Sequence, residues 1–144
     1  MKTLDDFSHA SSARAGGLSV LVVDDETAVR RFAVRVLERD GMGVLEATDG
    51  AEALEVVRAQ KAAIDVVVSD IVMPRLNGVE LMQALAESFP HLPVILMSGY
   101  ATAALSELGI ATPCGILTKP FPAERLLAEV HRCVGRRDGG SSAA

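Results

Sequence analysis

Aromatic residues, cysteine and positive charge are all scarce in this chain of 144 residues. It has no Trp, one Tyr and four Phe, so there is little of the aromatic surface on which bases usually stack. Acidic residues outnumber Lys and Arg by 19 to 14, and the formal charge of −5 does not supply the positive surface that nucleic-acid binding needs. We therefore expect no nucleic acid among its partners.

Long apolar runs are also missing, and none approaches the roughly 18 residues of a membrane-spanning helix. The N-terminal segment has early acidic residues and no apolar stretch behind Lys2, unlike a secretory signal. Cys114 and Cys133 are too few and too isolated for a disulfide framework or a zinc site, so we interpret them as packing residues. No membrane insertion is expected, and a reducing cytoplasm is the predicted compartment.

Short apolar runs alternate with helical patterns along the chain. The apolar runs predict five strands, at about 18–23, 43–47, 64–69, 94–97 and 115–118. Patterns of helical period predict helices at about 27–39, from 49 or 50, from 78 to 89, at 101–108 and from 122 to 135. Glu46 interrupts the second run, which favours an edge strand. This alternation predicts an α/β fold, a parallel sheet with helices on both faces, over residues 18–135, between a flexible leader (1–17) and a flexible tail (136–144).

Polar side chains follow four of the predicted strands at the point where each strand ends. They are Asp24 and Asp25, Asp70, Ser98 and Lys119. The carboxyl ends of parallel strands meet at one edge of a sheet, where such folds bind their ligands. Taken singly, each residue has a simpler explanation: the Asp pair as a helix cap, Asp70 as a turn former, Ser98 as a turn residue and Lys119 as a surface lysine. Their shared position favours a common site.

Three carboxylates brought together repel one another unless a cation lies among them. Oxygen ligands without His or Cys suit a hard ion such as Mg²⁺. A metal, a lysine and a hydroxyl around one carboxylate are the groups that phosphoryl transfer requires, and a carboxylate can itself act as the nucleophile. Asp70 is the predicted nucleophile, because a loop that can admit a phosphate donor follows it.

At this point the chain resembles the receiver domain of two-component response regulators. The matching blocks are Asp24-Asp25, Asp70 with Met73-Pro74 and Asn77-Gly78, Ser98-Gly99, and Lys119-Pro120-Phe121. The resemblance covers about residues 18–134, and the segment 96–101 is similar to receivers of hybrid sensor kinases. It implies a flavodoxin-like (βα)5 fold with strand order 2-1-3-4-5.

The resemblance also implies a role for each matching residue. Asp70 accepts a phosphoryl group from a phosphohistidine on a sensor histidine kinase or a histidine phosphotransfer protein. Asp25, Asp70 and the backbone carbonyl of Val72 bind Mg²⁺ directly, and Asp24 acts through water. Ser98 hydrogen-bonds the phosphoryl group, and Lys119 pairs with one of the phosphoryl oxygens. The peptide bond between Lys119 and Pro120 is expected to be cis. Output through contact with a downstream protein, or onward transfer of the phosphate, follows from the same resemblance.

One position departs from the family pattern. Receivers of this type commonly carry Tyr or Phe three residues before the lysine, where this chain has Ile116, although Tyr100 is available nearby. A degenerate receiver that serves only as an interaction module therefore stays open as an alternative. A phosphatase with an Asp nucleophile is the second alternative, and the missing second acid in Asp70-Ile71-Val72 argues against it.

Overall fold

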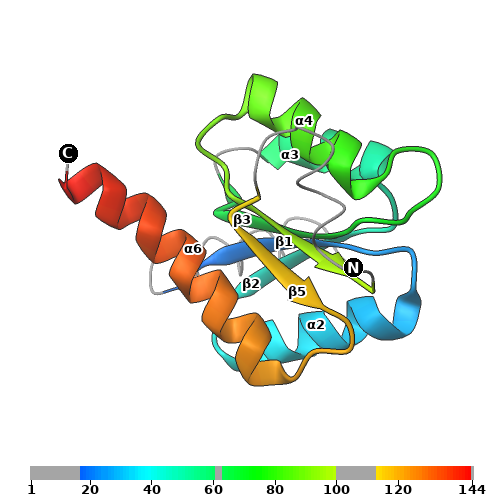
Figure 1. Cartoon of the computed structure of the whole chain (residues 1–144), viewed down its shortest axis with the longest axis horizontal. Helices are drawn as coiled ribbons and strands as arrows, with labels where there is room; N and C mark the ends of the chain where they lie inside the picture. The colour runs from blue at the N-terminus through cyan, green and yellow to red at the C-terminus, as the bar shows by residue number, and fades with distance from the viewer. Residues whose placement is uncertain (1–16, 61–62, 100–112, 144) are drawn as a thin grey trace.

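The computed structural model describes residues 17–60, 63–99 and 113–143 (Figure 1). Their elements follow one another along the chain as β1 (Ser19–Val23), α2 (Thr27–Arg39), β2 (Gly43–Ala47), α3 (Gly50–Gln60), β3 (Val66–Asp70), α4 (Gly78–Ser88), β4 (Val94–Ser98), β5 (Gly115–Thr118) and α6 (Ala123–Ala143). The predicted leader up to residue 16, the helix predicted at 101–108 and Tyr100 lie outside the described residues.

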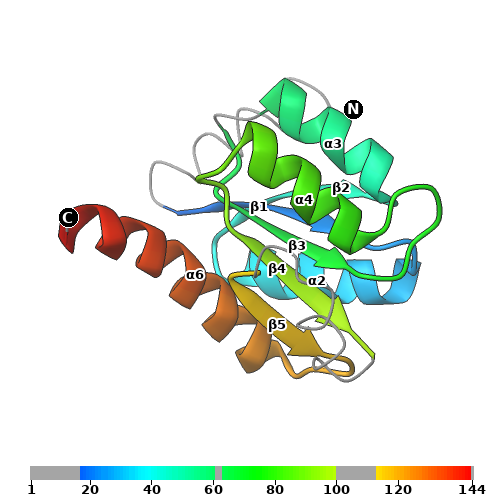
Figure 2. The same cartoon turned by 45° about the horizontal axis from the view of Figure 1, so that its top comes forward.

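All five strands form one parallel sheet in the order β2-β1-β3-β4-β5. This confirms the predicted flavodoxin-like topology, with β2 at an edge as Glu46 indicated. Figures 1 and 2 show α3 and α4 on one face of the sheet and α2 and α6 on the other. The crossovers bring the carboxyl ends of all the strands to the same edge, as the predicted site requires.

Alternate residues of the central strands supply two separate hydrophobic cores. Val20 and Val22 of β1 pack with α2 and α6, whereas Leu21 and Val23 pack with α3 and α4. Successive side chains of a strand point to opposite faces, so a strand covered on both sides is apolar throughout. This explains why β1 appears in the sequence as a continuous apolar run.

Local sequence signals set several element ends. Asn77 accepts a hydrogen bond from the Glu80 amide at 2.8 Å, and the Glu80 carboxylate accepts one from the Asn77 amide at 2.9 Å, a capping box that starts α4. Gly41, with φ of 89°, follows the end of α2 in the left-handed conformation that glycine adopts readily. Several boundaries differ from prediction by one or two residues, among them β3, which runs over Val66–Asp70. The largest difference is at α6, which continues past Gly135 to Ala143 because glycine weakens a helix without necessarily ending it.

The interpretation of the cysteines as separate packing residues is wrong, because Cys114 and Cys133 form a disulfide. They are 19 residues apart in sequence, but Cys114 directly precedes β5 and Cys133 lies on α6, which packs against β5. Their Cα atoms are 5.9 Å apart, within the range that a disulfide spans. The cysteines therefore give no support for a reducing compartment, and the cytoplasmic location stays a prediction.

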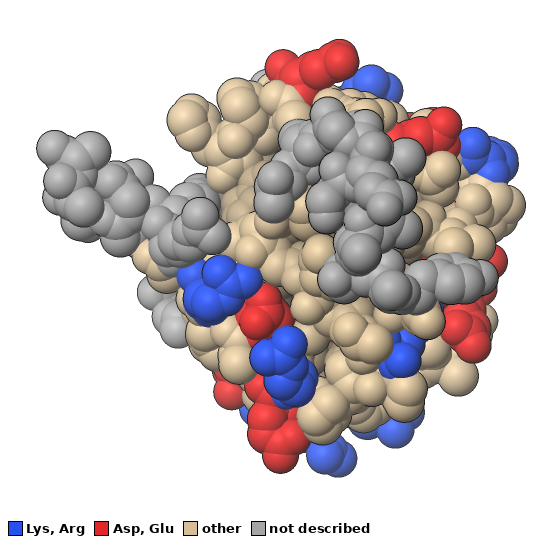
Figure 3. Space-filling model, in the orientation of Figure 1, with Lys and Arg blue, Asp and Glu red and all other residues tan. Residues whose placement is uncertain are grey.

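The described surface carries charges of both signs. On the face drawn in Figure 3, Lys and Arg side chains lie among Asp and Glu side chains. Within the described parts of the chain, no helix has the length and apolar character to cross a bilayer.

Candidate functional site

The neighbouring strands β1 and β3 bring the predicted carboxylates together. Val23 is paired with Ser69 in the sheet, so Asp24, just after β1, lies next to Asp70 at the end of β3. One carboxylate oxygen from each of Asp24, Asp25 and Asp70 lies within 4.8 Å of the other two. Asp24 and Asp70 are buried and Asp25 is exposed, so the cluster opens to solvent on one side.

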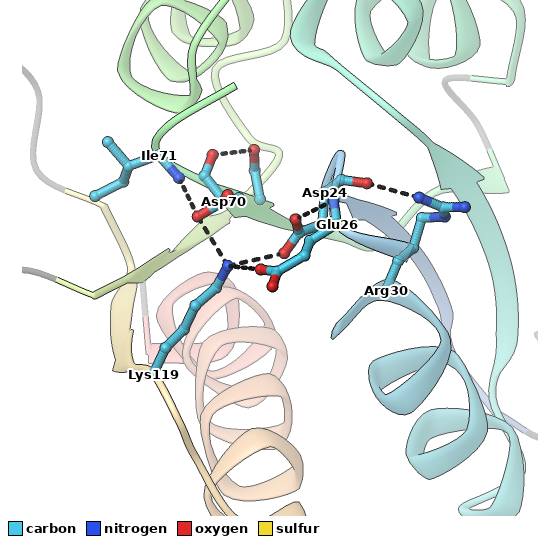
Figure 4. Close-up of polar contacts among 7 residues, drawn as sticks. Asp24, Glu26, Arg30, Asp70, Ile71 and Lys119 are labelled. Atoms are coloured by element: carbon cyan, nitrogen blue, oxygen red, sulfur yellow. Dashed lines mark hydrogen bonds and ion pairs between the residues drawn. The ribbon is translucent and has the colours of Figure 1, made fainter. Parts of the chain in front are cut away.

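Lys119, which follows the edge strand β5, points its ammonium group toward the carboxylates (Figure 4). Its Nζ lies 3.1 Å from Oδ2 of Asp24 and 3.2 Å from Oδ1 of Asp70. The Lys119 amide donates to the carbonyl of Ser98 at 2.8 Å, which fixes the start of the loop after β5, and the peptide bond to Pro120 is cis as expected. One ammonium group thus serves two buried acids contributed by different strands.

The surroundings of Asp70 raise the pKa of its carboxyl. Burial raises the pKa of the Asp70 carboxyl above its ordinary value of 3.8, and the nearby charge of Asp24 raises it further, against the opposing effect of Lys119. Burial alone would lower the pKa of Lys119, but its hydrogen bond to Asp24 and the charges of Asp24 and Asp70 outweigh burial and raise that pKa. Because Lys119 is shared between Asp24 and Asp70, its charge offsets only part of the rise in the pKa of Asp70.

Without metal, replacing Asp70 by Asn should raise the free energy of unfolding at neutral pH, by on the order of 1 kcal/mol. A carboxyl whose pKa is raised on folding stabilises the folded state below the unfolded pKa, and this contribution is lost as pH rises through the folded pKa. The advantage of Asn should therefore shrink as pH falls toward 3.8. Urea unfolding in EDTA across this pH range measures it, and a constant difference at all pH values would contradict the assignment.

The donor set fits a hard divalent cation. All three side chains offer carboxylate oxygens, the ligand type that Mg²⁺ prefers, and the Lys119 ammonium shows that positive charge is favourable between Asp24 and Asp70. Val72 lies two residues beyond Asp70 in the loop that leaves β3, with its side chain exposed. The backbone of this loop meets the cluster at Ile71, whose amide donates to Oδ1 of Asp70 at 2.9 Å.

Ser98 lies at the same edge of the sheet. It is the last residue of β4 and is buried, between β3, which ends at Asp70, and β5, which leads to Lys119. Ile116 of β5 pairs with Leu96 and is half-buried, so an aliphatic side chain occupies the position where the family pattern has an aromatic one.

Two further residues at the site were not predicted. Glu26 approaches Lys119 with its Oε1 at 3.6 Å, and Arg30 donates from Nη1 to the Asp24 carbonyl at 2.8 Å and from Nε to Glu46 at 2.9 Å. The signal was available, because Glu26 follows the acidic pair and Arg30 lies one helical turn beyond it. The simple cap explanation of Asp24 is not supported: Glu26 is the N-cap of α2, and Asp24 accepts from the Glu26 amide while pairing with Lys119.

A groove of about 520 Å³ lies next to Lys119 and Glu26. It is lined by Glu26, Ala28, Val29, Phe32, Lys119, Pro120 and Phe121. Phe32 is 41% exposed, and its ring centroid is 6.1 Å from that of Phe121. The charged site therefore borders an apolar surface formed by α2 and the loop after β5.

A family profile and individual relatives each match most of this chain. A family profile described as the response regulator receiver domain matches residues 20–131. Sensor kinase CckA of Brucella abortus is 38% identical over 125 residues, which are 86% of this chain and 13% of that protein. The response regulator receiver protein CpdR of Brucella abortus is 32% identical over 114 residues, which are 78% of this chain and 93% of CpdR.

Solved structures show the same similarity. The crystal structure of a response regulator receiver domain protein from Clostridium thermocellum aligns with a TM-score of 0.78 and 29% identity, covering 84% of this chain and 97% of that one. The similarity thus extends over nearly the whole of some relatives and a small part of others.

Proposed function

The chain belongs to the family of response regulator receiver domains, and from this premise we propose that it is a phosphorylation-controlled signalling switch whose phosphoryl acceptor is Asp70. The observation that carries the proposal is the meeting of Asp24, Asp25, Asp70 and Lys119 at one edge of the sheet. The family is one of signalling domains, so phosphorylation here is a self-catalysed acceptance of phosphate rather than turnover of a substrate.

In the proposed transfer, a carboxylate oxygen of Asp70 attacks the phosphorus of a phosphohistidine. The new O–P bond forms as the P–N bond breaks, and the imidazole nitrogen leaves with the electron pair and takes a proton from solvent. Lys119, already 3.2 Å from Asp70, pairs with a phosphoryl oxygen, and Ser98 donates its hydroxyl hydrogen to another. The protein thus contributes position and charge, which dominate catalysis of phosphoryl transfer.

Asp25, Asp70 and the carbonyl of Val72 would hold Mg²⁺, with Asp24 acting through water. Bound there, the ion supplies positive charge for the transferred phosphoryl oxygens. The oxygen-only donor set supports this assignment.

The proposed donor is a sensor histidine kinase or a histidine phosphotransfer protein in the cytoplasm. The groove beside Lys119, with the exposed Phe32 on its wall, offers such a partner an apolar contact next to the reacting carboxylate. The phosphorylated domain then acts through contact with a downstream protein or passes the phosphate on.

Incubation of the purified chain with acetyl phosphate and Mg²⁺ should add one phosphoryl group, stable in acid and labile in base, and EDTA should prevent this. Intact-protein mass spectrometry measures the gain. Labelling that is unaffected by EDTA would contradict the metal assignment. No labelling by acetyl phosphate or by any phosphohistidine donor would favour the degenerate interaction module, the alternative that Ile116 motivates.

A further inference from the structure

The loop between β3 and α4 is closed at its base by a glycine. The Gly78 amide donates to the Ile71 carbonyl at 2.8 Å, and a Cβ at Gly78 would overlap the carbonyl of Asp70. The Ile71 amide in turn donates to Oδ1 of Asp70 at 2.9 Å. The course of this loop is therefore linked directly to the orientation of the Asp70 carboxylate.

The far end of the loop is held by an ion pair outside the acidic cluster. Nε and Nη2 of Arg75 lie 2.9 and 2.6 Å from Oδ2 of Asp49, a buried carboxylate in the connection from β2 to α3. The other oxygen of Asp49 accepts from the Glu52 amide at 2.9 Å, so Asp49 also caps α3. Arg75 thus connects the loop to the start of α3.

A backbone contact accompanies this ion pair. The Gly50 amide donates to the Leu76 carbonyl at 3.0 Å, and a Cβ at Gly50 would overlap that same carbonyl. Two neighbouring residues of the loop, Arg75 and Leu76, therefore contact two neighbouring residues at the start of α3. The side-chain pair and the backbone bond together fix the loop's distance from α3.

Arg75 adopts φ of 68°, a left-handed conformation that is unfavourable for a residue with a side chain. Such a conformation persists when other contacts compensate for it, and the Arg75 side chain supplies one through its ion pair with Asp49. The hydrogen bonds around Asp49 support the pairing, because the Glu52 amide and then Arg75 lower the pKa of its carboxyl, although burial opposes this by raising it. Without the ion pair, we expect residue 75 to relax to negative φ and to shift the loop.

We propose that Arg75 is a positioning residue: its ion pair with Asp49 sets the course of the loop after β3, which holds the Asp70 carboxylate through the Ile71 amide and carries the Val72 carbonyl, for binding of a divalent cation. This inference rests on the proposed function and adds to it a pair of residues that do not touch the cation. Residues that orient metal ligands commonly change affinity about 10–100-fold when they are removed. Because Arg75 is largely exposed, we expect the lower end of that range.

The test is a Mg²⁺ titration of the full chain, in which the NMR amide shifts of Ile71 and Gly78 report binding. Arg75→Ala and Asp49→Asn should each weaken Mg²⁺ binding about tenfold. The double variant should be no weaker than either single one, because both changes remove the same ion pair. Arg75→Lys, which keeps the charge, should recover most of the affinity, a result that a general packing role for Arg75 would not produce.

Arg125→Ala is the matched control. It also removes one arginine from a partly exposed ion pair, with Glu129 on α6, and should leave the dissociation constant unchanged. Affinity of folded Arg75→Ala within twofold of wild type would overturn the inference and leave the proposed function standing. Absence of Mg²⁺ binding by the wild-type chain would instead overturn the metal site of the proposed function. If Arg75→Ala is too unstable to titrate, Asp49→Asn tests the same ion pair.

Discussion

Asp70→Asn should gain no phosphoryl group from acetyl phosphate and Mg²⁺ under conditions that phosphorylate the wild-type chain. The amide has nearly the same shape as the carboxylate, and its oxygen can still accept from the Ile71 amide. It lacks the negative charge and the nucleophilic oxygen that form the O–P bond. Intact-protein mass spectrometry of both proteins after the same incubation measures the difference.

Misfolding would not explain this loss, because Asp70→Asn is expected to be more stable than wild type in the absence of metal. Asp40→Asn provides the matched control: Asp40 is a partly exposed carboxylate after the end of α2, paired with His131 at 2.8 Å. It should be labelled as wild type is. Equal labelling of Asp70→Asn and wild type would exclude Asp70 as the acceptor.

Reduction of the disulfide between Cys114 and Cys133 should lower the free energy of unfolding by about 3 kcal/mol at 25 °C. This figure follows from the loss of loop-closure entropy for two cysteines 19 residues apart, since the bond restricts the unfolded chain more than the folded one. Urea unfolding with and without a phosphine reductant measures the effect as a shift of the midpoint.

The double variant Cys114→Ala, Cys133→Ala controls for effects of the reductant, because its midpoint should not respond to it. It should also be less stable than oxidised wild type, through the lost cross-link and the cavity left at the buried Cys133. A wild-type midpoint that is the same with and without reductant would mean that the two sulfurs are not bonded in solution.

The fold and the meeting of the charged groups were predictable because they follow from short-range patterns and one topological rule. Buried parallel strands are apolar throughout, as Val20–Val23 illustrates, so strand positions are visible in the sequence. The parallel arrangement then brings the residues after each strand to one edge, whatever the details of packing. The strand order came from the family resemblance and was confirmed by the structure.

Contacts that depend on side-chain direction between distant segments were not predictable. Cys114 and Cys133 meet only because α6 lies along β5, and neither residue carries a local signal for this. The ion pair of Arg75 and Asp49 likewise joins two loops whose separation is set by backbone conformation, including the positive φ at Arg75. Such pairings need the relative placement of whole elements, which residue patterns do not specify.

Because Lys119 is shared among several carboxylates, the charge of the site bears on the order in which a cation and a phosphate donor would bind. The cluster of Asp24, Asp25 and Asp70, with Glu26 beside it, has the one ammonium of Lys119 to offset its charge, so the ionised pocket carries a net negative charge. A phosphate donor, itself an anion, approaches against this field until a divalent ion offsets it. For the proposed phosphoryl transfer, cation first and donor second is therefore the favoured order of binding, and the rate of phosphorylation should depend on the Mg²⁺ concentration.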